Sequence, residues 1–79
     1  MGDTFTKVQD IICKRFGIGR SQVQEDTSLY YDLGMRTAPL LQLYQQIEKE
    51  FNIGIPDQAS DDFVTVGDIA DYLDTHKNR

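Results

Sequence analysis

The stretch Asp32-Leu33-Gly34-Met35-Arg36-Thr37-Ala38 decides the fold, because it joins a turn to the start of a helix. Beyond it, apolar residues recur at spacings of three and four, at Leu40, Leu43, Tyr44, Ile47 and Phe51. This period predicts an amphipathic helix. Pro39 falls in the first turn, where a missing N–H leaves no hydrogen bond unmade. Thr37 is then a candidate N-cap, whose hydroxyl would accept a hydrogen bond from a first-turn amide.

A helix is also predicted before this stretch. It is expected to be capped by Asp3 or Thr4 and to end at Gly17, with an apolar stripe at Phe5, Val8, Ile12 and Phe16. The connection from Ile18 to Arg36 is long for a small domain, and such loops are usually functional or internally packed. We expect it to pack on the core through its apolar residues, Ile18, Val23, Leu29, Tyr30 and Leu33.

Two further elements are predicted after the central helix. A short helical element is expected between Ile55 and Asp62. Thr65 opens a last helix, and Asp68 follows three residues later in an arrangement related to the capping box. The inner stripe of this helix consists of Val66, Ile69, Tyr72 and Leu73. The residues expected to dominate the contacts between helices are Phe16, Ile47, Phe51, Ile55 and Ile69.

These elements predict an all-α fold, a small bundle of three main helices and one short helix with a long ordered loop between the first two main helices. With 79 residues and 39% hydrophobic content, the chain is expected to form a single domain over residues 1–79. Its core is expected to span residues 4–75, followed by a short frayed C-terminal tail.

The net charge of −5 is unevenly distributed. Residues 1–20 contain four basic and two acidic residues, a balance of +2, so the remainder carries −7. An acidic surface repels nucleic acid and favours protein partners. One cysteine, Cys13, excludes an internal disulfide, and no apolar stretch approaches the length of a membrane span. We therefore expect a cytoplasmic monomer that binds proteins, with no nucleic-acid binding and no membrane insertion.

Enzyme activity is not expected, because no nucleophile–base pair or metal-ligand cluster is visible. Asp57, Asp61 and Asp62 lack the ligand spacing of a calcium loop. His76 has no cysteine or second histidine as a partner, so metal binding is not predicted there either.

The quoted stretch resembles the Asp-Leu-Gly-x-Asp-Ser-Leu signature of acyl carrier proteins, in which the serine carries a 4'-phosphopantetheine arm. Arg36, Thr37 and Ala38 stand at the aspartate, serine and leucine positions of this signature. The resemblance extends from about residue 8 to residue 73. Its other blocks are Phe16-Gly17-Ile18, Ser28-Leu29, Ile55-Pro56-Asp57 and Thr65-Val66-Gly67-Asp68.

The resemblance implies an acyl-carrier-type bundle that acts as a non-catalytic carrier or docking module in fatty-acid, polyketide or other specialised biosynthesis. The implied cofactor is 4'-phosphopantetheine, attached at Thr37. The implied partners are biosynthetic enzymes, among them a dedicated acyl ligase or transferase. The implied docking residues lie at the start and along the exposed side of the central helix, at Arg36, Ala38, Leu41, Gln42, Gln45 and Glu48. Ser28 matches a structural serine of the loop.

Three interpretations of Thr37 remain open at this point. It is an arm-free helix cap, a position that is still modified in its own pathway, or the result of a recent or engineered change from serine. The extra methyl group makes the hydroxyl secondary and restricts χ1. The alternative function is therefore an arm-less interaction or regulatory module that keeps only the carrier fold.

Aromatic residues leave two more questions open. The resemblance places Tyr44 and Phe63 at positions where the family often has smaller aliphatic side chains that line a cleft for an acyl chain. The two rings are expected either to fill that cleft or to belong to an ordinarily repacked core. Of Tyr30 and Tyr31, at least one is expected to pack inward.

Overall fold

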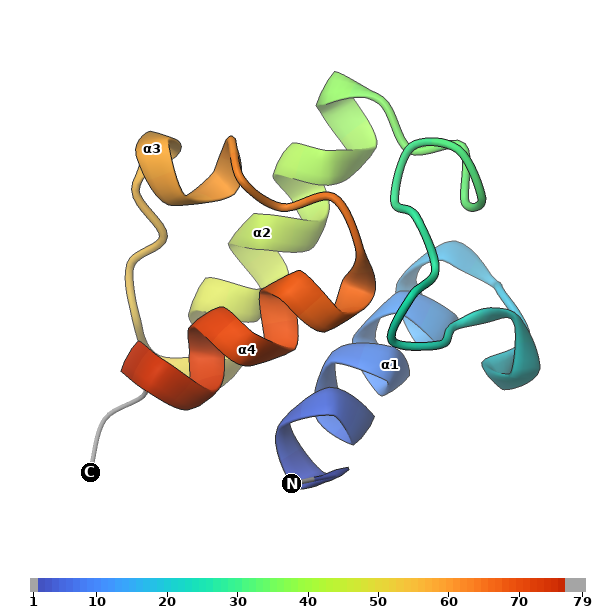
Figure 1. Ribbon diagram of the computed structural model, residues 1–79, viewed down its shortest axis with the longest axis horizontal. Helices are drawn as coiled ribbons and strands as arrows, with labels where there is room; N and C mark the ends of the chain where they lie inside the picture. Colours follow the sequence, from blue (N-terminus) through green and yellow to red (C-terminus); the bar gives the residue numbers. More distant parts are fainter. Residues whose placement is uncertain (1, 77–79) are drawn as a thin grey trace.

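The computed structural model describes residues 2–76, with side chains from residue 4 onward. Its elements, in chain order, are α1 (Gly2–Phe16), a 3-10 turn η1 (Arg20–Gln22), α2 (Thr37–Phe51), α3 (Asp57–Ser60) and α4 (Val66–His76). Helix α1 packs against both α2 and α4, and the long connection covers one side of the bundle (Figure 1). The predicted all-α bundle is thus confirmed. The expected frayed tail lies outside the described residues.

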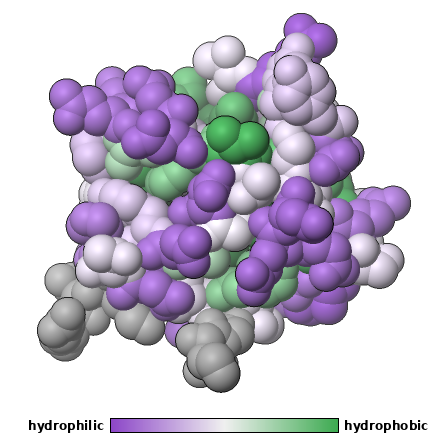
Figure 2. Space-filling model, in the orientation of Figure 1, coloured by the Kyte–Doolittle hydropathy of each residue, from purple (hydrophilic) through white to green (hydrophobic). Residues whose placement is uncertain are grey.

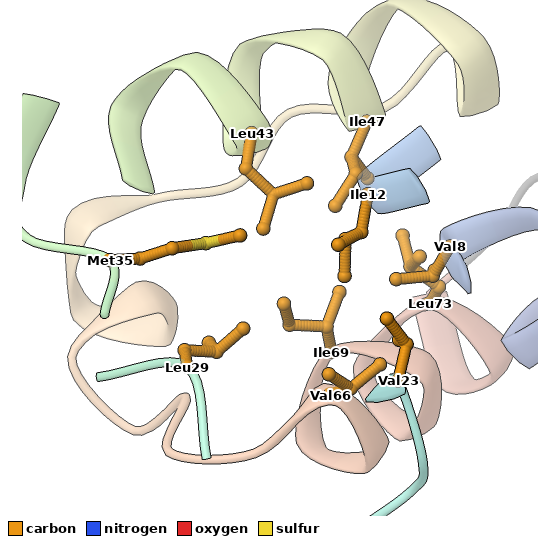
Figure 3. Close-up of a cluster of buried hydrophobic side chains, with 10 residues drawn as sticks. All are labelled: Val8, Ile12, Val23, Leu29, Met35, Leu43, Ile47, Val66, Ile69 and Leu73. Atoms are coloured by element: carbon orange, nitrogen blue, oxygen red, sulfur yellow. The ribbon is translucent and has the colours of Figure 1, made fainter. Parts of the chain in front are cut away.

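The core lies where α1, α2, α4 and the long connection meet. Its members converge from all four segments in Figure 3, and they are Val8, Ile12, Val23, Leu29, Met35, Leu43, Ile47, Val66, Ile69 and Leu73. Of the residues expected to dominate the helix contacts, Ile47 and Ile69 are fully buried, whereas Phe16, Phe51 and Ile55 are only half-buried. On the side seen in Figure 1 the surface is mostly hydrophilic, with apolar residues showing between polar ones (Figure 2).

The long connection is fastened to the bundle by hydrogen bonds as well as by apolar contacts. The buried amide of Gln9 donates to the carbonyls of Arg20 and Val23, at 3.2 and 2.8 Å. At the other end, the N–H groups of Val66 and Gly67 donate to the carbonyls of Thr27 and Glu25, at 3.0 and 2.8 Å. The first amides of α4, which have no partner within their own helix, thereby hold the loop. The prediction that the connection packs on the core is confirmed for Ile18, Val23, Leu29 and Leu33, but it is wrong for Tyr30, which is exposed.

The ends of α1 and α4 test the predicted helix boundaries. Gly17, with φ of +67°, ends α1 as expected. The predicted cap at Asp3 or Thr4 is wrong, because the helix already begins at Gly2 and the Thr4 hydroxyl donates to the Asp74 carboxylate at 2.5 Å. The capping box of α4 is confirmed. The Thr65 N–H donates to the Asp68 carboxylate at 3.0 Å, and the Asp68 N–H donates to the Thr65 hydroxyl at 3.2 Å.

Candidate functional site

A hydrogen-bonded turn directs the chain into α2. The Asp32 carboxylate accepts the N–H of Ser28 at 2.7 Å, and the Ser28 hydroxyl accepts the N–H of Tyr31 at 3.0 Å. Leu29 and Met35 anchor the turn in the core, and the Met35 N–H donates to the Leu29 carbonyl at 2.9 Å. The start of α2 is therefore held by a turn whose polar groups satisfy one another, and the Ser28 hydroxyl is engaged within it.

The predicted cap at Thr37 is wrong by one residue. Arg36 is the N-cap, with extended backbone, and its carbonyl accepts the N–H of Leu40 at 3.0 Å. A capping side chain would bond the second or third helical N–H. Here the third helical residue is Pro39, which has no N–H, and no side chain caps the helix. Thr37 is thus the first residue of α2. Its side chain is exposed, and its hydroxyl makes no hydrogen bond within the described part of the chain.

The surroundings of Thr37 are cationic and aromatic. The first turn of α2 contains no acidic residue, and the guanidinium of Arg36 lies 5.6 Å from the centroid of the Tyr30 ring. Tyr30 and Tyr31 are 49% and 84% exposed and contact each other edge to face. The expectation that one of them packs inward is wrong, because Leu29 and Met35 occupy the inward positions of the turn.

The other residues implied in docking lie along α2 beyond Thr37. Ala38, Gln42 and Gln45 are exposed, and Leu41 is 52% exposed. Their spacing of three and four places them on one face of the helix. Glu48 differs from them, since it is half-buried and its carboxylate accepts the N–H of Ile55 at 2.7 Å. It fixes the segment that leads out of α2.

A row of aromatic rings joins α2 to α4. The centroids of Tyr44 and Phe63 are 5.7 Å apart, and those of Phe63 and Tyr72 are 5.5 Å apart. His76 stacks on Tyr72 at 4.1 Å. Burial, and secondly the negative charge of Asp61, raise the pKa of the Tyr44 hydroxyl above its ordinary value. The sequence identified the first two rings, and the four-residue spacing of Tyr72 and His76 on one helix is the signal that extends the row.

Two properties of the described residues bear on other kinds of site. Within residues 2–76, no three His, Cys, Asp or Glu side chains are grouped as metal ligands would be. None of the helices there is both long and apolar enough to cross a bilayer.

The chain resembles known proteins along nearly its whole length. Residues 6–73 match the family model described as phosphopantetheine attachment site. An acyl carrier protein of Clostridium acetobutylicum is 33% identical over 72 residues, which cover 91% of this chain and 94% of that protein. An acyl carrier protein of Wolinella succinogenes is 29% identical over 73 residues, which cover 92% of this chain and 96% of that protein.

A small helical bundle with an exposed hydroxyl at the start of α2 is consistent with the class of carrier domains. With these matches, the chain belongs to the acyl carrier protein family. Members of this family are non-catalytic carriers that bear 4'-phosphopantetheine and interact with biosynthetic enzymes. The role of this chain is accordingly that of a carrier and not of an enzyme.

Proposed function

We propose that Thr37 is the residue through which this carrier holds its 4'-phosphopantetheine arm. The observation that carries the proposal is an exposed hydroxyl, free of hydrogen bonds to the described residues, at the first position of α2. A capping role would have occupied this hydroxyl and argued for an arm-free site. The arm supplies a terminal thiol that carries an acyl group as a thioester.

The residues around Thr37 fit the phosphodiester of such an arm. The N–H groups in the first turn of a helix, together with the helix dipole, favour an anion at that end. The first turn of α2 holds no carboxylate that would repel the phosphate. Arg36 adds a guanidinium at the adjacent residue, which is the side chain best suited to pair with phosphate oxygens. Arg36 at the signature's aspartate position therefore supports attachment.

The same surface bears on which partners the carrier would meet. We infer a dedicated set of enzymes, including an acyl ligase or transferase, in fatty-acid or a related specialised biosynthesis. These enzymes would contact Arg36 and the exposed strip of Ala38, Leu41, Gln42 and Gln45. Neutral amides give no long-range attraction, so recognition would depend on short-range contacts more than on steering by charge.

Mass spectrometry of the intact protein tests the attachment. The parent, Thr37→Ser and Thr37→Val are incubated with coenzyme A and a broad-specificity phosphopantetheinyl transferase. We expect rapid loading of Thr37→Ser, loading of the parent at least about tenfold slower because its hydroxyl is secondary and its χ1 restricted, and none of Thr37→Val. Valine keeps the shape of threonine and has a methyl group in place of the hydroxyl, so it is the matched control.

The second candidate function is an arm-less docking or regulatory module, and the β-branched residue at the attachment position favours it. Protein purified from a host without a dedicated transferase is expected to be mostly unmodified under either proposal. A parent that never gains the arm, while Thr37→Ser gains it, would support the module. An arm mapped to a peptide that does not contain Thr37 would refute the proposed site.

A further inference from the structure

A groove of about 460 Å³ lies between α1 and α2, apart from the attachment position. From α2 it is lined by Gln46 and Glu50. These residues are nine and thirteen positions beyond Thr37, which places them about 14 and 20 Å away along the helix axis. The groove is therefore a separate surface of the molecule, and a partner bound there would leave the start of α2 open.

The rim of the groove is basic. Lys7, Lys14 and Arg15 line it from α1 and are exposed to solvent. Within the described residues, no carboxylate forms an ion pair with any of these three side chains. They account for most of the positive charge in the N-terminal quarter of a chain whose net charge is −5.

The acidic residues of the groove are already engaged. Asp10 forms an ion pair with Arg20, which lies outside the groove. The carboxylate of Glu50 accepts a hydrogen bond from the side-chain amide of Gln46 at 3.2 Å. Glu50 keeps its negative charge, but the three cations that line the groove outnumber its two acidic residues, so the charge balance of the groove is cationic.

The apolar residue that lines the groove is Ile11. Ile11 is half-buried and lines the groove between the basic residues. The ammonium of Lys7 lies 5.9 Å from the centroid of the Phe51 ring, so its aliphatic stem follows apolar surface. An apolar residue flanked by exposed cations is the complement of an amphipathic helix that bears carboxylates beside its apolar stripe.

We propose that this groove binds an acidic amphipathic helix of a partner protein. Apolar side chains of the helix contact Ile11, and its carboxylates pair with Lys7, Lys14 and Arg15. A protein fits better than a nucleic acid or an anionic membrane, because Asp10 and Glu50 lie among the cations and would repel a continuous row of phosphates. Carboxylates at helical spacing can meet the separate cations and avoid those two acids.

Titration with defined peptides tests this proposal. The probe is an 18-residue helical peptide with a leucine stripe flanked by glutamates, added to the unmodified protein while its backbone amide signals are followed by NMR. We expect shifts at Ile11, Lys14 and Gln46, and an affinity that falls as sodium chloride is added. A peptide with lysine in place of glutamate is expected not to bind. The experiment needs no arm, so its outcome is separate from that of the loading assay.

Charge variants locate the binding surface. The double variant Lys14→Glu, Arg15→Glu turns two attractive charge pairs into repulsive ones. Each exposed pair contributes modestly, so both are changed together, and binding is expected to weaken about tenfold or more. Lys14→Gln with Arg15→Gln removes the charges without placing acids at the C-terminal end of α1, and it is expected to weaken binding as well. Lys49→Glu changes an exposed lysine of α2 outside the groove and should change affinity less than about twofold.

Three results of the peptide titration would overturn the proposal. They are equal binding of the basic peptide, shifts that cluster on α4, and no binding at millimolar peptide. Movement of the groove signals on dilution of the protein alone would show that a second copy occupies the groove, and it would also reject the proposed partner.

Discussion

At Gly67 the backbone of the long connection passes close to α4, so replacing this glycine with alanine tests how the loop is held. A Cβ atom at this position would lie 2.7 Å from the carbonyl oxygen of Glu25 and 3.4 Å from its carbonyl carbon. A separation of 2.7 Å is closer than real Cβ contacts, and the obstacle is backbone, which cannot swing away as a side chain can. Either α4 or the loop must move, and the 2.8 Å hydrogen bond from Gly67 to Glu25 lengthens or breaks.

The expected cost follows from three terms. Overpacking costs about 1–3 kcal/mol, and weakening one hydrogen bond costs about 0.5–1.5 kcal/mol. Alanine in place of glycine within a helix returns about 0.5–1 kcal/mol. We therefore expect Gly67→Ala to lower the free energy of unfolding by about 1–3 kcal/mol. For a domain of this size, the melting temperature should fall by about 5–20 °C.

The assay is thermal unfolding followed by circular dichroism, with Gly19→Ala as the matched control. A Cβ atom at Gly19 meets nothing within 4 Å, and its φ of −66° suits any residue. Gly19→Ala should therefore melt at the parent's temperature or slightly above it. Hydrogen exchange at the Leu29 amide, which donates to the Val64 carbonyl at 2.9 Å, should be faster in Gly67→Ala if the loop has loosened. If Gly67→Ala melts no lower than the parent, the close approach does not restrain the loop.

Two other predictions follow from α4 and α2. The backbone N–H groups of Thr65 and Val64 lower the pKa of the Asp68 carboxyl below its ordinary value of 3.8, so the carboxylate stabilises the native state above that pH. Asp68→Asn should melt lower than the parent at pH 7, and the difference should shrink as the pH falls below about 4. Arg36→Asp with Gln42→Glu should raise the association rate with a fatty-acid-synthesis enzyme that has a basic docking patch, and added salt should reduce the gain. Stopped-flow mixing at two salt concentrations measures the association rate of parent and variant. A parent that already binds fast with steep salt dependence contradicts the prediction.

The helices and their order could be predicted from the sequence because burial of one face imposes a period that no other structure shares. Val66, Ile69 and Leu73 are buried as their spacing predicted, and Gly17 ends α1 because its positive φ is unfavourable for other residues. Burial within each stripe was less predictable. Phe51 and Ile55 have the expected period but lie at the margin of the core, since their depth depends on how the helices cross.

The helix starts were harder to predict, because a cap depends on where the preceding chain arrives. Thr4 has the right chemistry for a cap, yet its hydroxyl is used by Asp74, which is 70 residues away in sequence. At α2 the turn delivers Arg36 to the cap position, and Pro39 removes an amide that a capping hydroxyl could have bonded. Neither the distant partner nor the direction of entry is encoded in the local pattern. The exposed hydroxyl of Thr37 therefore became apparent only with the structure.

The two proposed surfaces, the attachment position at Thr37 and the groove between α1 and α2, differ in charge. An arm on Thr37 places an anionic phosphodiester beside the cation of Arg36, so the loaded site would be close to electrically neutral. A carrier with aspartate in place of Arg36 would present two negative charges at the same point, to which a basic partner is drawn. This chain lacks that attraction, since Arg36 is basic and Gln42 and Gln45 are neutral. The unpaired cations that could steer a partner lie in the groove between α1 and α2, where Lys14 and Arg15 attract acidic surfaces. An acidic partner would then be attracted to one face of the molecule, and the acyl arm would be presented on another. A partner could hold α1 while the arm remains free to reach a second enzyme.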